Sequence, residues 1–249
     1  MRLTVVGCSG SIPGPDSGGS CYLLEHDGFR VVVDMGHGSI GALQRHTALD
    51  AVDAIVLSHL HADHCVDLTA FHVAHRYGPF TFTGPVPLYG PSDSLARVAA
   101  ADGMRSPEPL NDSFDFRDLA TAASIGPFRV RAERVAHPVE AYAIRFEVNE
   151  RTLTYSGDTA PCAALNELAQ DVDLLLAEAS FVHGADNPPN LHLTGREAGE
   201  AARDSGARRL VITHVPPWHD AAAAAAEASE VYDGPITTAT PAMTIDLDG

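Results

Sequence analysis

The sequence has few basic residues and no long apolar run. Of its 249 residues, 16 are Lys or Arg and 33 are Asp or Glu, so the formal net charge is −17. Non-specific nucleic-acid binding depends on basic side chains that neutralise phosphates, and this balance argues against it. The longest apolar run, Ala221 to Ala226, has six alanines, well short of the roughly 18 residues that span a membrane. The opening MRLTVVGCSGSIPG has too short an apolar stretch for a signal peptide.

Cysteines and aromatic residues are also scarce. The four cysteines are far apart and form no CxxC pair, so we expect reduced, buried small hydrophobic side chains in a cytoplasmic protein. They are Cys8, Cys21, Cys65 and Cys162. Hydrophobic residues make up 45% and charged residues 20%, which is typical of a globular chain. Neither a repeat nor a linker divides the sequence, which therefore predicts one domain over residues 1–249.

Short β-branched runs and helical periodicities alternate along the chain, which predicts the α/β class with mixed sheets and outer helices. The expected strands are 2–7, 22–24, 29–34, 52–57, 86–89, 128–136, 141–148, 152–156, 172–177, 208–213 and 243–247. The expected helices are 39–46, 66–77, 94–101, 161–170, 194–206 and 220–232. Residues 103–124 give no clear pattern and could form a lid or a rim.

Several residues of the types that bind metal ions follow the expected apolar strand 52–57. Within six residues stand His59, His61, Asp63 and His64. Residues two apart face the same side of an extended segment, so we expect His59, His61 and Asp63 to point together. His64 follows as the chain turns into a helix. Imidazole and carboxylate are the ligands of zinc and similar divalent cations, so this segment predicts a metal site.

Three other expected strands also end next to a histidine or an aspartate that could bind a metal ion. His137, Asp158 and His214 each lie just beyond β-type residues. The four strand ends together supply five histidines and two aspartates, more than one tetrahedral ion needs. With one carboxylate shared, they suit two cations of four protein ligands each.

The order of these motifs resembles that of the metallo-β-lactamase superfamily. Several segments resemble those of its ribonuclease Z-like phosphodiesterase branch. They are SGDT, EAS, HLT, ITH, the opening GCSGSIPGPDSGGSCYLL and VVVDMGHG. This resemblance extends from Val5 to His214. It implies a four-layer αββα fold, in which two mixed β-sheets are sandwiched between helices.

The resemblance also implies roles for individual residues. It implies a dinuclear centre with two divalent metal ions as cofactors, zinc first and manganese as the alternative, and with Asp34 orienting the ligand loops. The implied metal ligands are His59, His61 and His137 on one ion, Asp63, His64 and His214 on the other, and Asp158 between them. Asp63 would also be catalytic by orienting the attacking water.

A second implied catalytic residue is His192, in the sequence LHLT, which would face the scissile phosphate. The other interpretation is an exposed loop histidine. Glu178 matches an acidic position of the branch, and a structural hydrogen bond explains it as well as catalysis does. His72 and His75 are expected on a helix surface, and His219 could line the cleft.

The implied substrate is a small phosphodiester. Ribonuclease Z carries a tRNA-gripping arm between the positions of His137 and Asp158, and the twenty residues here leave no room for one. GALQRH, SHLHADHC and THVPPW are most similar to the atypical class II cyclic-nucleotide phosphodiesterases of actinobacteria. This likeness implies hydrolysis of a 3′,5′-cyclic nucleotide such as cAMP to the 5′ monophosphate.

Other functions stay open. They are ribonuclease Z-like RNA 3′ processing, hydrolysis of a lactone, thioester or β-lactam, and a non-catalytic metal-binding or sensor role. The His192 motif counts against the lactone, thioester and β-lactam enzymes, whose branches lack this histidine. The branch is commonly dimeric, so a homodimer is expected from the resemblance alone. Trp218 could stack on a base, pack internally or lie at a subunit contact.

Overall fold

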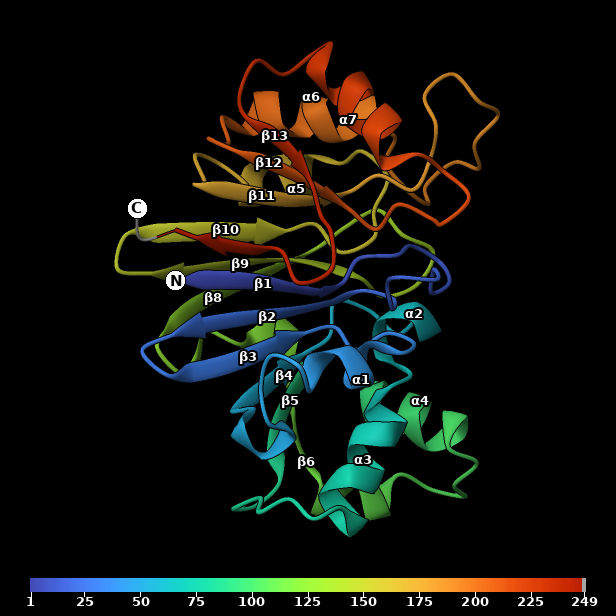
Figure 1. Cartoon of the computed structure of the whole chain (residues 1–249), viewed down its shortest axis with the longest axis vertical. Helices are drawn as coiled ribbons and strands as arrows, with labels where there is room; N and C mark the ends of the chain where they lie inside the picture. Colours follow the sequence, from blue (N-terminus) through green and yellow to red (C-terminus); the bar gives the residue numbers. More distant parts are fainter. Residues whose placement is uncertain (248–249) are drawn as a thin grey trace.

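Fourteen strands form two seven-stranded sheets that pack against each other, with helices outside both. The computed structural model describes residues 1–247. In Figure 1, the upper sheet is covered by α5 (Ala163–Leu168), α6 (Gly195–Ser205) and α7 (Ala221–Ser229). To the right of the lower sheet lie α1 (Ser39–Leu43), α3 (Leu68–Tyr77) and α4 (Ser94–Ala101). This arrangement is the four-layer αββα fold, and it confirms the predicted fold class.

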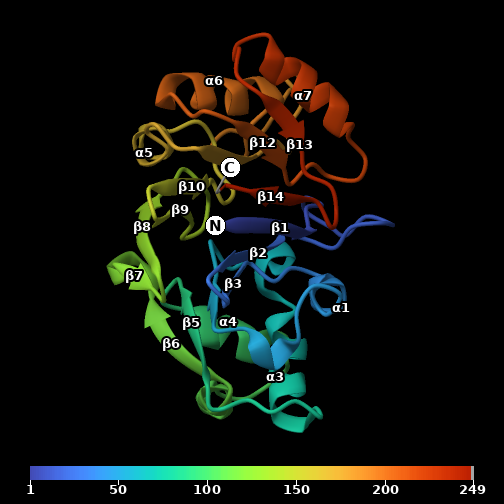
Figure 2. The same ribbon diagram turned by 60° about the vertical axis from the view of Figure 1, so that its left-hand side comes forward.

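The first sheet comes from the N-terminal half of the chain plus the last strand. Its order is β14-β1-β2-β3-β4-β5-β6, antiparallel from β14 to β3 and parallel from β3 to β6. Figure 2 shows β1 and β14 side by side. The strands are β1 Arg2–Gly7, β2 Cys21–His26, β3 Phe29–Val33, β4 Ala54–Val56, β5 Val86–Gly90, β6 Phe114–Asp118 and β14 Thr244–Asp246.

The second sheet repeats this plan. Its order is β13-β12-β11-β10-β9-β8-β7, parallel from β13 to β10 and antiparallel from β10 to β7. The strands are β7 Ser124–Ile125, β8 Phe128–Arg134, β9 Tyr142–Val148, β10 Arg151–Tyr155, β11 Leu174–Glu178, β12 Leu210–Thr213 and β13 Ile236–Thr238.

Seven α-helices and three 3₁₀ turns connect the strands. The helices are α1 Ser39–Leu43, α2 Ala62–Cys65, α3 Leu68–Tyr77, α4 Ser94–Ala101, α5 Ala163–Leu168, α6 Gly195–Ser205 and α7 Ala221–Ser229. The 3₁₀ turns are η1 Leu49–Ala51, η2 Glu108–Asp112 and η3 Leu119–Thr121. Among residues 1–247, none of these helices has the length and apolar character needed to cross a membrane.

Helix α6 shows how the sequence sets a helix boundary. Thr194 accepts a hydrogen bond from the backbone N–H of Glu197, and the Glu197 carboxylate accepts one from the N–H of Thr194. This capping box satisfies donors that the first turn would otherwise leave unpaired. Gly206 ends the helix at φ 68°, a left-handed conformation that suits glycine. The helix therefore begins three residues after His192.

The core between the sheets holds side chains from both of them. The inner face of the first sheet contributes Leu3 and Tyr22, and that of the second contributes Phe128, Phe146 and Leu153. All five are nearly inaccessible to solvent. Side chains alternate between the two faces of a strand, so each sheet turns one set of apolar side chains toward the other sheet and another set toward the helices. Burial of these side chains holds the layers together.

The residues that gave no pattern form part of the sheets and of their connections. Segment 103–124 contains η2, β6 and η3. Strand β6 is an edge strand, with three of its five residues exposed, which explains the absence of an apolar run. Residues 248 and 249, which the one-domain prediction includes, lie outside the described part of the chain.

Two expectations about burial are wrong. His72 is not on the surface of α3 but only 6% exposed, with Nδ1 2.8 Å from the Ser113 hydroxyl. Cys162 is only partly buried, whereas the other three cysteines are buried. All four thiols are free, as expected.

Phe146→Ala tests the role of the core between the sheets. Phe146 is fully buried and meets Phe128 edge to face, with 6.0 Å between ring centroids. We expect the free energy of unfolding to fall by about 3–5 kcal/mol, because a large cavity remains. Denaturant unfolding followed by circular dichroism measures this, and Val73→Ala at a 49% exposed position should change it by less than about 0.5 kcal/mol. A loss below about 1 kcal/mol for Phe146→Ala would contradict the packing described.

Candidate active site

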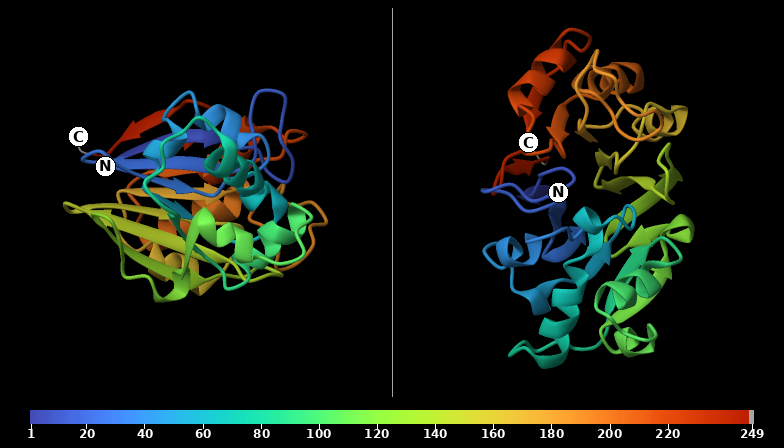
Figure 3. Two further views of the ribbon diagram at one scale, coloured as in Figure 1. Left: turned by 90° about the horizontal axis from the view of Figure 1, so that it is seen from below. Right: turned by 90° about the vertical axis from the view of Figure 1, so that its right-hand side faces the viewer.

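The predicted ligand residues lie at one edge of the two sheets. Strand β4 ends shortly before His59, β10 shortly before Asp158, and β12 directly before His214. The arrows of β1 and β10 point to the right in Figure 1, and this edge faces the viewer in the right panel of Figure 3. Parallel strands bring their carboxyl ends to a common edge, which is where α/β folds place their ligand sites.

The chain changes direction inside the histidine-rich segment. His61 is extended, with φ −68° and ψ 151°, and α2 begins at Ala62. His59 and His61 therefore face one group of residues, while Asp63 and His64 face another. The expectation that His59, His61 and Asp63 point together holds only for the two histidines, because the helix begins before Asp63.

The segment after β3 fits closely against α2. The backbone N–H of Met35 donates to the carbonyl of His64 over 2.7 Å. A Cβ atom on Gly36 would lie 1.9 Å from the carbonyl oxygen of Asp63, so only glycine fits there. This contact fixes the position of α2 and of the two ligand candidates that it carries.

The first cluster consists of His59, His61, His137 and Asp158. Nδ1 of His61 lies 3.1 Å from Nε2 of His59 and 3.2 Å from Nε2 of His137. Nε2 of His59 lies 3.6 Å from an Asp158 oxygen. Ligands at about 2.0–2.1 Å from a tetrahedral cation lie about 3.3–3.4 Å apart. The spacing therefore suits one metal ion.

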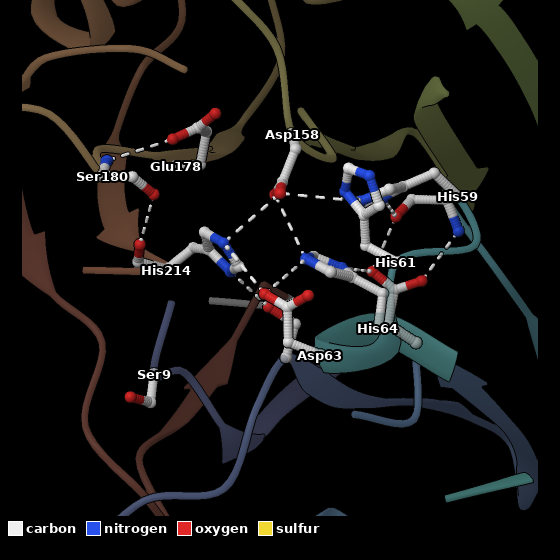
Figure 4. A network of polar contacts seen from close by, with 12 residues as sticks. Ser9, His59, His61, Asp63, His64, Asp158, Glu178, Ser180 and His214 are labelled. Carbon is white, nitrogen blue, oxygen red and sulfur yellow. Dashed lines mark hydrogen bonds and ion pairs between the residues drawn. The ribbon is translucent and has the colours of Figure 1, made fainter. Parts of the chain in front are cut away.

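The second cluster consists of Asp63, His64, His214 and Asp158. Nε2 of His64 and Nε2 of His214 each lie 3.3 Å from an Asp158 oxygen, and 3.7 and 3.6 Å from Oδ2 of Asp63. Figure 4 shows Asp158 between the two clusters, with contacts to His59, His64 and His214.

Three atoms of the second cluster are buried and make no hydrogen bond within residues 1–247. They are Nε2 of His64, Nε2 of His214 and Oδ1 of Asp158. A buried polar atom without a partner costs about 1–3 kcal/mol, so such atoms are rare and call for an explanation. Their convergence fits a metal ion, and the residues present suit two divalent cations.

Asp34 fixes one of these histidines from behind. Its carboxylate is inaccessible to solvent and accepts hydrogen bonds from the backbone N–H and hydroxyl of Ser58, from the Tyr155 hydroxyl and from Nδ1 of His64. The bond to Nδ1 directs Nε2 of His64 into the second cluster. Asp34 thus joins the ends of β3, β4 and β10, which are the contacts expected of the orienting aspartate that the resemblance implies.

Sequence reasoning missed the partners of three further rings. Nδ1 of His59 lies 3.1 Å from the Ser58 hydroxyl, and Nδ1 of His214 lies 2.8 Å from the Ser20 hydroxyl. Nδ1 of His137 lies 2.9 Å from the carbonyl oxygen of Leu191. Such partners set the tautomer that a ligating histidine needs. Ser58 directly precedes the motif and could have been found, whereas nothing in the sequence singles out Ser20 or a backbone carbonyl.

Burial and charge set the protonation of the two clusters. Burial lowers the pKa of His59, His61 and His137, and lowers that of His214 to about 4. Burial also disfavours a charged His64, but the carboxylates of Asp158 and Asp34 outweigh it and raise its pKa. Four of the five rings are therefore neutral at pH 7, the form in which histidine binds metal.

His192 and Glu178 form a pair beside the clusters. Nδ1 of His192 lies 2.8 Å from Oε1 of Glu178, and 3.9 Å from Asp158. The fully buried Glu178 carboxylate also accepts hydrogen bonds from the N–H groups of Thr159 and Ser180. Both oxygens are thus engaged, which explains Glu178 as the group that orients His192. Burial lowers the pKa of His192, but Glu178 outweighs this and raises it to about 9, so the ring is cationic at neutral pH.

The remaining candidates lie at the margin of the site. Nδ1 of His219 lies 3.0 Å from the carbonyl oxygen of Ser180, and its side chain lines a small hollow of ≈ 250 Å³ with Ser9 and Pro216. Trp218 is 59% exposed. This excludes internal packing as its role and leaves base stacking and a subunit contact.

Two clusters of side chains that suit metal ions and share an aspartate, with a cationic histidine beside them, are typical of a metal-dependent hydrolase. Residues 30–215 match the family model described as "Beta-lactamase superfamily domain". The chain belongs to the metallo-β-lactamase superfamily, and the ribonuclease Z-like branch fits it.

Individual relatives agree with this assignment. An uncharacterised protein of Mycobacterium leprae is 43% identical over 99% of this chain and 89% of its own. The crystal structure of the metallo-β-lactamase fold protein YhfI from Bacillus subtilis is similar, with a TM-score of 0.86 and 26% identity over 98% of each chain. A ribonuclease Z of Myxococcus xanthus is 28% identical over 99% of this chain and 98% of its own.

Asp34→Asn tests the network behind the second cluster. The amide keeps the shape of the carboxylate but cannot accept all four hydrogen bonds, so His64 loses its fixed orientation. We expect zinc affinity to fall about 10–100-fold, as measured by competition with a coloured chelator. Asp233→Asn removes the same charge at an exposed position and should leave the affinity as it is. Equal affinity in the two variants would exclude this role, provided that circular dichroism shows both folded.

Proposed function

We propose that this chain is a dinuclear metal-dependent phosphodiesterase that hydrolyses a small phosphodiester. The best candidate substrate is a 3′,5′-cyclic nucleotide such as cAMP, which would yield the 5′ monophosphate. The observation that carries the proposal is the His192–Glu178 pair beside two clusters that share Asp158. Expectations of a cytoplasmic location and of a homodimer stay predictions.

The proposed ligands follow the two clusters. His59, His61 and His137 would hold one cation, and Asp63, His64 and His214 the other, with Asp158 bridging them. Such nitrogen-rich sites suit zinc, with manganese as the alternative. Bound cations would supply positive charge for the phosphate oxygens and lower the pKa of a water molecule.

Two side chains would handle protons and orientation. Asp63 is 8% exposed at the edge of the second cluster, where it can orient the attacking water. His192 is held by Glu178 through Nδ1, and its Nε2 makes no hydrogen bond within residues 1–247. A cationic imidazole there can donate a proton to the leaving oxygen. The charge of His192 also stabilises the negative charge that builds on the phosphate.

The substrate is proposed to be small because the chain offers no arm for tRNA. Between His137 and Asp158 the structure has only the hairpin of β9 and β10, which turns at Asn149 and Glu150. The net charge of −17 also opposes a long polyanion. RNA 3′ processing is the second candidate, since relatives at 25–28% identity are named ribonuclease Z.

Asp158→Ala tests the bridging role. Asp158 belongs to both clusters, so its loss should weaken both metal positions. We expect fewer than two zinc ions per chain after dialysis, measured by plasma mass spectrometry, and no turnover. Two tightly held ions in the variant would contradict the bridging assignment. Asp233→Ala is the control and should keep the metal content of the unsubstituted chain.

Turnover of cAMP, cGMP and bis(p-nitrophenyl) phosphate by the metal-loaded protein tests the reaction. We expect hydrolysis of a cyclic nucleotide, and His192→Ala should keep both metals and lose about 10²–10⁴-fold in kcat. Intact cAMP and cGMP with zinc or manganese supplied would contradict the cyclic-nucleotide assignment. Hydrolysis of the chromogenic diester alone would support a phosphodiesterase activity but not a cyclic-nucleotide substrate. An RNA 3′ end would then be the next substrate to test.

A further inference from the structure

A hollow of ≈ 630 Å³ opens beside the first cluster, between α4 and the segment after His137. His61 forms part of its wall, so the hollow adjoins a proposed metal ligand. Sites for small molecules commonly enclose about 300–1,000 Å³. The hollow is therefore large enough for a nucleoside attached to a phosphate at the clusters.

Its lining combines apolar and polar groups. Leu60, Pro91, Ala96 and Val139 provide apolar surface, and Val139 is 37% exposed. Apolar surface of this kind suits the flat faces of a base, and polar groups placed among such residues give a site its specificity. Neither the proposed metal ligation nor the proposed proton transfer uses these residues.

Arg97 is the basic residue in this lining. Its Nε donates to the carbonyl oxygen of Leu60 over 3.2 Å, which ties the guanidinium to the segment between His59 and His61. Its terminal nitrogens have no hydrogen bond or ion pair within residues 1–247. The chain contains no lysine, and most of its arginines outside the hollow meet a carboxylate, as Arg76 meets Asp112.

Arg97 does not pair with the carboxylates that share the hollow. Asp93 and Glu140 both belong to the lining, and neither lies within ion-pair distance of Arg97. Glu140 is instead held by the Tyr142 hydroxyl at 2.6 Å. The hollow thus presents hydrogen-bond donors on Arg97 and acceptors on Asp93 and Glu140, without an ion pair between them. A nucleoside offers acceptors on its base for a guanidinium, and hydroxyl or amino donors for a carboxylate.

We propose that this hollow binds the nucleoside part of the diester, and that Arg97 and Glu140 determine specificity there. This inference rests on the proposed function. The base lies on the apolar surface, Arg97 donates to its acceptors, and Glu140 accepts from a hydroxyl or amino group of the nucleoside.

Binding of 5′-AMP and of inorganic phosphate to the metal-loaded protein tests the inference without turnover. We expect 5′-AMP to bind at least tenfold more tightly than phosphate in isothermal titration. In Arg97→Ala and Glu140→Ala this advantage should shrink several-fold, because each variant loses one hydrogen-bonding side chain of the hollow. Arg105→Ala removes an exposed arginine beyond α4 and should keep the advantage. Equal binding of 5′-AMP and phosphate by the unsubstituted protein would overturn the inference.

Kinetics separate this inference from the proposed function. In Arg97→Ala we expect KM for the cyclic nucleotide to rise about tenfold, with kcat within about twofold. The ratio of kcat/KM for cAMP to that for bis(p-nitrophenyl) phosphate should fall about tenfold, because the chromogenic diester has no nucleoside. An equal loss of kcat/KM on both diesters would overturn the inference, but it would not contradict the proposed phosphodiesterase activity. Absence of cyclic-nucleotide turnover in the unsubstituted protein would overturn the proposed substrate. The comparison of 5′-AMP with phosphate would still show whether the hollow binds a nucleoside.

Discussion

The buried carboxylate of Asp158 is the group on which the rest of the site depends. It is only 1% exposed, and an ionised carboxylate in such a place must be compensated by opposite charge or hydrogen bonds. Burial by itself raises the pKa of Asp158, but the rings of His214, His64 and His59 outweigh burial and lower it. Each of these rings comes from a different part of the chain or faces a different cluster. Asp158 therefore connects side chains that follow strands of both sheets.

The sheets explain how these groups reach the same place. Both sheets are antiparallel on one side and parallel on the other, and their parallel strands end at a common edge. Asp34, at the end of β3, binds Ser58 after β4 and Tyr155 at the end of β10. One buried carboxylate therefore connects strand ends from both sheets and holds His64 at the same time. The apolar core between the sheets makes this geometry rigid.

The net charge of the chain and the expected local charge at the site have opposite signs. A net charge of −17 opposes polyanions over the whole surface, while bound cations and a cationic His192 would create a local positive field. A small diester experiences mainly the local field, because solvent and salt screen the distant charges beyond about 8–10 Å. Arg97 matters for the same reason, since it is a cation beside the hollow that forms no ion pair with a carboxylate of residues 1–247.

Much of the fold could be predicted from the sequence, because burial follows local patterns. The helix at residues 94–101 has the predicted bounds, and most strands lie within a few residues of their expected positions. Segment 103–124 could not be read, since an exposed edge strand such as β6 has no continuous apolar face. His72 was misplaced because its partner, Ser113, lies 41 residues away.

The sequence by itself determined the residue types of the site, since HxHxDH and the three later strand ends carry the ligand chemistry locally. Only the tertiary structure decided which side chains meet. The turn into α2 separates Asp63 from His59 and His61. Glu178 had two interpretations until the fold placed His192 against it, 14 residues away. Likewise, Ser20 meets His214 across 194 residues. Contacts over such separations depend on how the sheets pack, which no local pattern encodes.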